Sequence, residues 1–285
     1  MYLKLVDYLV NNNILYDYQF GFRQHYSTSH ALISLVDKIS KALDKGELLV
    51  GVFLDLSKAF DTVNHDILIK KLAKYGIKGN VLKWFQCYLS NRKQYVIYDN
   101  SVSSISDIVC GVPQGSILGP LLFLLYINDI KNVSNILFPI IYADDTNIFI
   151  QGNCIDDLIL EMNRELVKLN NWFQSNKLSL NVKKTHFMVF HRSRRKFNRT
   201  EDIIINNNVI EEKNSTTFLG VIMDSGLTWE DHVNYIKNKV SKAIGIINKV
   251  KHCINRSNLI SLYNSFIIII ISLFAHNRNC LGLVQ

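Results

Sequence analysis

The chain has 285 residues, of which 48% are hydrophobic and 20% charged, a composition that supports a folded core and excludes a disordered chain. Its formal net charge of +8 favours a polyanionic partner. Five scattered cysteines without a C-x-x-C pair disfavour a disulfide scaffold and a zinc ribbon, and they favour a reducing, intracellular compartment.

The first part of the chain alternates helical and strand patterns. The apolar run 48–54 is rich in β-formers and predicts a buried strand that delivers Asp55 at its end. Asp99 and Asn100 provide the turn of a hairpin. The expected elements are a helix over 29–45 that ends at Gly46, the strand 48–54, helices over 65–75 and 79–90, and a hairpin of 94–98 with 102–109.

The central part contains a helix and a tight hairpin. Pro120 opens the helix, at a position where proline is tolerated, after a loop that contains several glycines. Two β-like runs, 136–142 and 146–150, are separated only by Ala143 and the pair Asp144-Asp145. This pattern predicts a hairpin with two carboxylates at its tip.

The last part is strongly basic. From His232 to the end the sequence contains no Asp or Glu. The expected elements are a helix over 155–174, a strand over 185–190, a basic run over 191–199, a hairpin-like pair at 202–206 and 209–212, a strand over 217–224 and a helix over 233–252. We therefore expect one compact unit followed by a small, basic, helical appendage.

Neither end of the chain has the pattern of a membrane or export signal. Lys4 and Asp7 interrupt the apolar start, which excludes a signal peptide of the usual form. Residues 259–275 are apolar, but Asn264 and several serines interrupt them, and a spanning helix needs about 20 predominantly apolar residues. We expect no membrane partner.

The carboxylates carry the chemistry. Asp55 follows one buried strand, and Asp144 and Asp145 lie at a hairpin tip about ninety residues later. Carboxylates that meet at strand ends can hold two divalent cations for phosphoryl transfer, and hard oxygen ligands suit Mg²⁺. On its own, an Asp pair is also an ordinary hairpin turn.

Five ordered motifs give the sequence a family resemblance. They are FLDLSKAFD (53–61), GVPQGSILGPLLFLLYIND (111–129), YADD (142–145), LSLNVKKTHFMVF (178–190) and FLGVIMD (218–224). In this order they resemble reverse transcriptases of non-LTR (LINE-type) retrotransposons. The similarity extends upstream to QFGFRQHYSTSHAL (19–32) and downstream to LTWEDHVNYIKNKVSKAIG (227–245).

The resemblance implies an α+β right-hand polymerase, in which an antiparallel sheet of the palm carries the catalytic aspartates. Fingers and palm would occupy residues 1–225, and a small helical thumb would occupy 226–285. A basic motif that the family has upstream of QFGFR is missing, so we expect incomplete fingers. The Ile-rich tail also departs from the family pattern, and we expect a chain truncated at both ends.

The resemblance also implies a set of metal ligands. Asp55, Asp144, Asp145 and the backbone carbonyl of Leu56 would bind two Mg²⁺ ions, with Mn²⁺ as an alternative. Asp61 has a different expected role, as a turn or helix-start residue.

For the nucleotide, the family pattern makes Phe60 a steric gate that excludes the 2′-hydroxyl, although the residue alone is an ordinary core aromatic. Gln114 and Gly115 would contact the incoming nucleotide or the template base. Arg23 would act from the fingers. Lys184 would assist the departing pyrophosphate, with Lys183 as the competing candidate.

Primer and template would be held further along the chain. Phe218, Leu219 and Gly220 resemble the primer grip. The basic run and the lysine-rich helix would contact phosphates without reading sequence.

The function implied is an RNA-directed DNA polymerase, in which the 3′-hydroxyl of a primer attacks a dNTP. Its partners would be an RNA or DNA template with primer and dNTPs, in the cytoplasm or nucleus. The alternative is a catalytically inactive retrotransposon remnant that at most binds nucleic acid nonspecifically.

Overall fold

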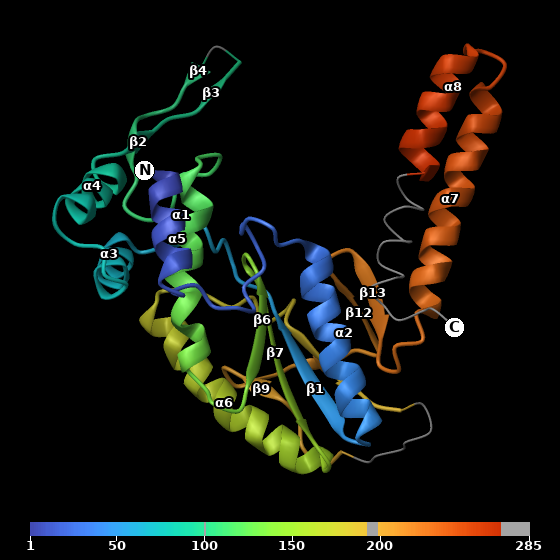
Figure 1. Ribbon diagram of the computed structural model, residues 1–285, viewed down its shortest axis with the longest axis horizontal. Coiled ribbons are helices and arrows are strands. Elements are labelled where there is room, and N and C mark those ends of the chain that lie inside the picture. The colour runs from blue at the N-terminus through green and yellow to red at the C-terminus, as the bar shows by residue number, and fades with distance from the viewer. Residues whose placement is uncertain (100, 193–198, 269–285) are drawn as a thin grey trace.

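A five-stranded sheet forms the centre of the computed structural model, which describes residues 1–99, 101–192 and 199–268 (Figure 1). Its strands lie in the order β11 (Glu211–Glu212), β8 (His186–Phe190), β1 (Leu48–Leu54), β7 (Asp145–Gly152) and β6 (Phe138–Tyr142). Strand β1 pairs antiparallel with both β7 and β8, and β6 and β7 form the expected hairpin. Only the edge pair of β11 and β8 is parallel.

The central strand is covered on both faces, which explains its unbroken apolar sequence. All seven residues of β1 are buried. One face packs with α5 (Leu118–Ile127) and α6 (Ile155–Ser175), whose apolar residues share a core cluster with Val50 and Val52. The other face packs with α2 (Thr28–Asp44), whose Leu35 and Ile39 share a cluster with Phe53.

The described elements before β6 follow the predicted order, with two differences. Helices α3 (His65–Lys74) and α4 (Gly79–Leu89) lie where expected, and Gly46, at φ +77°, ends α2 as predicted. Helix α1 (Tyr2–Asn11) was not among the expected elements. The predicted hairpin of 94–98 with 102–109 is present, but its strands are interrupted and form two short ladders: β2 (Lys93–Gln94) pairs with β5 (Ser106–Asp107), and β3 (Ile97–Tyr98) pairs with β4 (Ser101–Val102).

A second correction concerns residues 217–224, which we expected to form one strand. They belong to a hairpin of β12 (Ser215–Phe218) and β13 (Val221–Asp224). The chain reverses at Leu219 and Gly220, which have φ of +48° and +84°. Two successive left-handed residues match the twist of a tight hairpin turn and break the strand that the apolar pattern suggests.

A third correction concerns the pair 202–206 and 209–212. Its hairpin is shorter, β9 (Ile204–Ile205) with β10 (Asn208–Val209), and the next residues join the main sheet as β11. The described part of the chain ends in α7 (Glu230–Val250), α8 (Arg256–Tyr263) and a π-helical turn, η2 (Asn264–Ile268). A 3₁₀ turn, η1 (Asn128–Asn132), follows α5. The rest of the Ile-rich tail and most of the basic run 191–199 lie outside the described residues.

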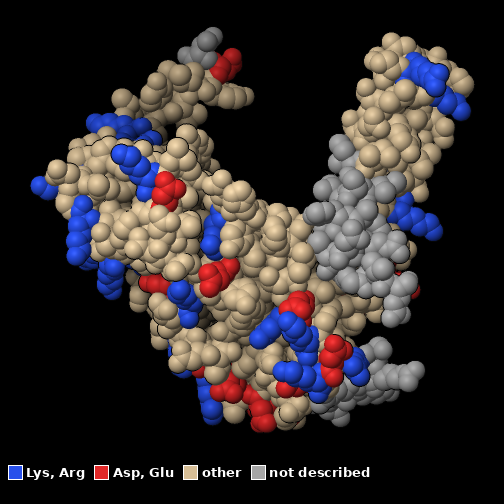
Figure 2. Space-filling view, viewed as in Figure 1, with Lys and Arg blue, Asp and Glu red and all other residues tan. Residues whose placement is uncertain are grey.

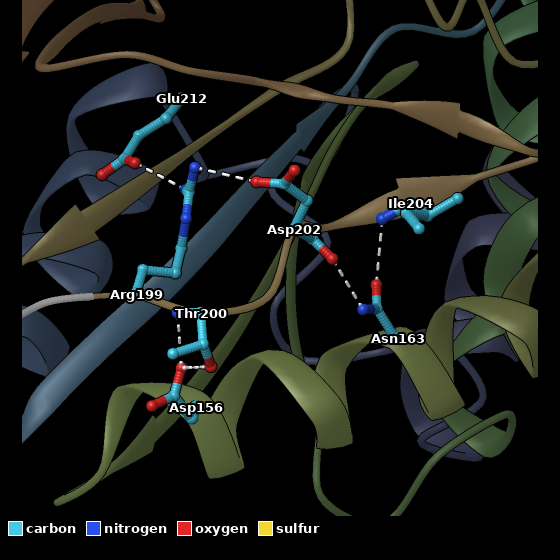
Figure 3. Close-up of polar contacts among 7 residues, drawn as sticks. All are labelled: Asp156, Asn163, Arg199, Thr200, Asp202, Ile204 and Glu212. Atoms are coloured by element: carbon cyan, nitrogen blue, oxygen red, sulfur yellow. Dashed lines mark hydrogen bonds and ion pairs between the residues drawn. The ribbon is translucent and has the colours of Figure 1, made fainter.

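Hydrogen bonds fix the segment that leads into β9 against α6 (Figure 3). The guanidinium of Arg199 donates to Glu212 at 2.6 Å and to Asp202 at 3.0 Å. The backbone N–H and the hydroxyl of Thr200 both donate to Asp156 on α6. The same network includes Asn163, whose amide binds the backbone of Asp202 and Ile204.

The molecule has two arms with a hollow between them (Figure 2). Helices α7 and α8 form one arm, while α1, α3, α4 and the β2–β5 hairpin form the other (Figure 1). The β6–β7 turn lies at the end of the sheet that faces the hollow (Figure 1). Among the helices that the structure describes, none combines the length and apolarity that a membrane span requires.

Candidate active site

The pairing of β1 with β7 brings the three predicted carboxylates to one place. The ladder ends with Leu54 opposite Thr146, so the next step along the same register sets Asp55 beside Asp145. Asp145 itself pairs with Tyr142 across the hairpin, which puts Asp144 in the turn. Residues far apart in sequence thus meet because antiparallel strands keep a fixed register.

The turn before the two aspartates is held by a residue that the sequence did not single out. Ala143 has φ +57°, the left-handed conformation that non-glycine residues rarely adopt. Its N–H donates to the side-chain oxygen of Gln19 at 3.1 Å, and the N–H of Gly21 donates to the same oxygen at 2.9 Å. Gln19 is only 2% exposed, so this contact is shielded from water.

The segment around Gln19 runs alongside β6 as an additional extended chain. The N–H of Phe20 donates to Ile141 O at 2.8 Å, and the N–H of Ile141 donates to Tyr18 O at 2.9 Å. A Cβ atom on Gly21 would lie 2.3 Å from the backbone nitrogen of Ala143. Only glycine permits such a close approach without displacement. The resemblance had marked this stretch, but only the structure assigns it a role.

The site is electrostatically uncompensated. Desolvation, followed by the negative charges of Asp144 and Asp55, raises the pKa of Asp145 above its ordinary value. Among the described residues, no Lys, Arg or His forms an ion pair with any of the three carboxylates. Nor does the described chain contain three Asp, Glu, His or Cys side chains already arranged as a coordination shell. The three carboxylates lie together, and their negative charge suits a divalent cation.

The loop that carries the candidate lysines is attached directly to Asp55. The N–H of Asn181 donates to Asp55 O at 2.8 Å, and the N–H of Asp55 approaches Thr185 Oγ1 at 3.4 Å. Lys183 and Lys184 are both exposed in the turn between these contacts. The loop that carries both lysines is therefore fixed to the backbone of Asp55, and these contacts do not choose between them.

His186 connects this loop to the β12–β13 hairpin. Its ring stacks on Phe53 at 5.2 Å between centroids, and its Nε2 lies 2.6 Å from Thr216 Oγ1. Burial lowers the pKa of His186, so the ring is neutral near pH 7. Phe53 also contacts Phe218, a predicted grip residue, with 6.5 Å between ring centroids.

The three predicted grip residues form the end of the β12–β13 hairpin. Phe218 is buried at the end of β12, whereas Leu219 is half-buried and Gly220 is exposed in the turn. His186 was not among the residues predicted for the site, although its position within a strand of apolar residues was an available signal.

Phe60 lies against aromatic rings at the end of the turn after Asp55. It stacks on Phe123 of α5 at 4.3 Å between centroids and meets Phe22 edge-on at 6.0 Å. The ring is half-buried. The carbonyl of Phe60 accepts from the N–H of Val112, which ties the glycine-containing loop to the same turn.

Gln114 pairs with Asp61 beside a cavity. Its side-chain nitrogen donates to Asp61 Oδ1 at 2.7 Å, and both residues are exposed. They line a cavity of about 590 Å³ that also includes Lys58 and Arg92. Asp61 is a turn residue as predicted, while Asn64 caps α3 by accepting from the N–H of Ile67.

The remaining two predicted residues lie in loops. Gly115 has φ +76°, which favours glycine. Arg23 donates to the carbonyls of Tyr16 at 2.8 Å and Gln19 at 3.1 Å, and its guanidinium lies over the ring of Tyr26. Its described contacts stabilise the segment that supports the Ala143 turn.

Comparison with known proteins identifies the family and the fold. The sequence model of the family described as "Reverse transcriptase (RNA-dependent DNA polymerase)" matches residues 1–223. Two relatives come from mobile elements of flies. The chain is 29% identical to the "Probable RNA-directed DNA polymerase from transposon BS" of Drosophila melanogaster, covering 91% of this chain. It is 28% identical to the "RNA-directed DNA polymerase from mobile element jockey" of Drosophila funebris, covering 90% of this chain.

The chain spans only 29% of the length of each of these relatives. Among solved structures, telomerase from Candida tropicalis in complex with a fragment of telomeric RNA has a TM-score of 0.57 at 12% identity. The match covers 79% of this chain and 36% of that one. Telomerase from Candida albicans has a TM-score of 0.53 at 14% identity, over 98% of this chain and 47% of that one. These likenesses show a shared right-hand polymerase fold.

Proposed function

Since the chain belongs to the reverse transcriptase (RNA-dependent DNA polymerase) family, we propose that it is the polymerase portion of a retrotransposon enzyme that copies a template into DNA. The reaction adds dNTPs to the 3′-hydroxyl of a primer paired with RNA or DNA. The observation that carries the proposal is the register of β1 with β7, which sets Asp55 beside the Asp144-Asp145 turn. The site of action is the cytoplasm or nucleus.

We propose Asp55, Asp144 and Asp145 as the ligands of two Mg²⁺ ions, or Mn²⁺ in their place. Because the carbonyl of Asp55 binds Asn181 on one side, the next carbonyl along the extended chain, that of Leu56, points toward the β7 side and is the fourth proposed ligand. The bound ions would neutralise charge on the attacking and leaving oxygens. The carboxylates have no other described cationic partner, which supports this assignment.

The nucleotide would lie between the carboxylates and the loop of Gln114. Phe60, supported from behind by Phe123, is the proposed gate against a 2′-hydroxyl. Gln114 and Gly115 would contact the nucleotide or the template base, and Arg23 would act through the segment that it holds.

The bond changes are those of an in-line displacement. The 3′-hydroxyl of the primer releases its proton to water, its oxygen forms a bond to the α-phosphorus, and the bond from that phosphorus to pyrophosphate breaks. Lys184 would neutralise the leaving pyrophosphate, with Lys183 as the alternative.

The primer would be held by Phe218, Leu219 and Gly220, at the end of the β12–β13 hairpin. Lysines on α7, which include Lys237, Lys242 and Lys249, would contact phosphates across the hollow. We assign residues 1–225 to fingers and palm and 226–285 to a thumb region. The proposed boundary falls in the loop between β13 and α7.

Primer extension on poly(rA)/oligo(dT) with Mg²⁺ tests the proposal. We expect extension by the chain and none by Asp144→Ala. If neither protein extends the primer while both bind duplex in a salt-sensitive manner, the chain is an inactive remnant that binds nucleic acid nonspecifically. We expect the exposed lysines of α7 to give salt-sensitive duplex binding whether or not the chain extends the primer.

A further inference from the structure

The surface of α3 and α4, on the arm opposite α7, is basic. The lysines of these two helices have no role in the proposed active site. Between Asp66 and Asp99 the chain has no Asp or Glu. Over the same stretch it carries Lys70, Lys71, Lys74, Lys78, Lys83, Arg92 and Lys93. Lys71 is buried and paired with Asp129. The blue side chains along the left edge of Figure 2 lie where Figure 1 places these two helices.

Two aromatic rings are stacked on this surface: Trp84 is exposed, and Tyr88 is half-buried, with one side packed against the core. Trp84 and Tyr88, one helical turn apart on α4, have ring centroids 5.3 Å apart and planes inclined by only 11°. The fully buried side chains of α4 are instead Phe85 and Leu89. Trp84 is 39% exposed, so a large apolar ring is presented to solvent within a basic surface.

Arg92 links the two stacked rings to the cavity beside Gln114. The guanidinium of Arg92 lies 5.7 Å from the centroid of the Tyr88 ring. Arg92 also lines the cavity of about 590 Å³, together with Lys58 and Gln114. The aromatic stack and the cavity are therefore joined by one cationic side chain.

Two acids, Asp61 and Asp107, line the cavity together with two cations, Arg92 and Lys58. In the described chain neither of these cations forms an ion pair with a carboxylate. Asp107 lies 3.9 Å from Lys93. Asp61 accepts a hydrogen bond from the neutral amide of Gln114 and keeps its negative charge in the cavity. A phosphate would provide the missing partner for the two cations.

We propose that Trp84, Tyr88 and Arg92 form a platform for single-stranded nucleic acid, whose backbone continues past Lys58 into the cavity. Unpaired bases can stack on exposed aromatic rings, whereas paired bases in a duplex present no free faces. An acidic peptide would satisfy the charges but would leave the stacked rings without a matching surface. The identification of this strand as incoming template rests on the proposed polymerase function.

Tryptophan fluorescence provides a direct readout, because the other two tryptophans are less accessible. Trp229 is buried, and Trp172 is half-buried with the Lys71 ammonium over its ring. A short oligo(U) strand should quench the emission of Trp84, and the same strand paired in a duplex should quench it far less. Trp84→Phe should abolish the quenching but retain binding of a dye-labelled strand by anisotropy, because a ring remains.

The double variant Trp84→Ala/Tyr88→Ala should weaken strand binding roughly tenfold or more, the usual effect of removing base-stacking rings. Arg92→Gln should weaken it and reduce its salt dependence. Lys45→Gln removes one exposed charge after the end of α2 and serves as the matched control, with little expected change. Thermal unfolding of each variant verifies that the fold is intact.

Three results would overturn the platform: no quenching of Trp84 by the strand, equal quenching by the duplex, or stronger quenching by phosphatidylserine vesicles than by the strand. Asp144→Asn separates this proposal from the polymerase function, because it should stop primer extension but leave quenching unchanged. Quenching without extension by the unmodified chain would remove the polymerase function and retain the platform. Extension without quenching would do the reverse.

Discussion

The side chain of Gln19 accepts a hydrogen bond from the backbone N–H of Ala143 at 3.1 Å, across 124 positions of sequence. Ala143 is the left-handed residue of the turn that presents Asp144 and Asp145. The same oxygen of Gln19 binds the N–H of Gly21. The segment around Gln19 and the proposed catalytic turn are thus fixed to one another by a single buried acceptor, and the first two predictions follow from this contact.

Removal of that acceptor should reduce both stability and activity. Gln19→Ala leaves the N–H groups of Gly21 and Ala143 unpaired, and we expect a loss of about 1–3 kcal/mol in the free energy of unfolding. Primer extension should fall further than the change in folded fraction explains, because the turn loses its support. Urea unfolding and extension rates measure both effects. Gln24→Ala, at an exposed position of the same loop, should leave both unchanged, and an equal loss there would refute the specific role of Gln19.

The close approach of Gly21 to Ala143 gives a second prediction, in which atoms are added and not removed. Gly21→Ala puts a methyl group 2.3 Å from the nitrogen of Ala143, and the backbone must shift to relieve the overlap. We expect destabilisation of about 1–3 kcal/mol and reduced extension. Gly245→Ala on α7 has nothing within 4 Å of the added atom and should be neutral or slightly stabilising. If Gly21→Ala and Gly245→Ala both unfold at the temperature of the unmodified chain, the packing at Gly21 is not tight.

Phe60 should control the choice of sugar. Its half-buried ring is backed by Phe123 at 4.3 Å, so it cannot retreat from a bulkier ribose. Phe60→Ala should admit ribonucleotides, with the preference for dTTP over UTP falling by about tenfold or more, a change of roughly 1.4 kcal/mol. Single-nucleotide incorporation on poly(rA)/oligo(dT) measures it. Phe60→Tyr keeps the ring and should keep the preference, and unchanged selectivity in Phe60→Ala would remove the gate assignment.

Part of this architecture could be predicted from the sequence, and the rest could not. The strand over 48–54 and the hairpin that carries Asp144 in its turn could be inferred because buried strands leave continuous apolar runs. The contact of Gln19 with Ala143 leaves no periodic signal, since it joins one side chain to a distant backbone group. The split at Leu219 and Gly220 was missed although the glycine was a visible signal of a turn. The pairing of Asp61 with Gln114 likewise depends on tertiary structure.

Asp224 should make the β13–α7 connection sensitive to acid. Its carboxylate accepts from the N–H groups of Gly226, Thr228 and Trp229. Although burial opposes them, these bonds lower the pKa of Asp224 below its ordinary 3.8. The folded state therefore favours the charged form, and the contribution is fully present above that value and lost as pH falls toward the depressed folded pKa.

The comparison of two variants isolates this contribution. Asp224→Asn should cost about 1–3 kcal/mol at pH 7, because charge-assisted hydrogen bonds are lost. The cost should stay constant down to about pH 5 and shrink below pH 4. Urea unfolding across this range measures it. Asp17→Asn changes an exposed aspartate and should cost little at any pH. A penalty in Asp224→Asn that grows on acidification would contradict the assignment.

The most direct test of the whole account is single-nucleotide incorporation by Asp55→Asn and Asp144→Asn beside Asp66→Asn, an exposed aspartate on α3. Each change removes one negative charge with little change in volume, and circular dichroism verifies that all three variants fold. We expect Asp55→Asn and Asp144→Asn to lose about a thousandfold or more in rate, since several kcal/mol of transition-state stabilisation depend on metal-binding carboxylates. Asp66→Asn should retain the rate of the unmodified chain. Incorporation by Asp144→Asn at the rate of Asp66→Asn would contradict the assignment of this site.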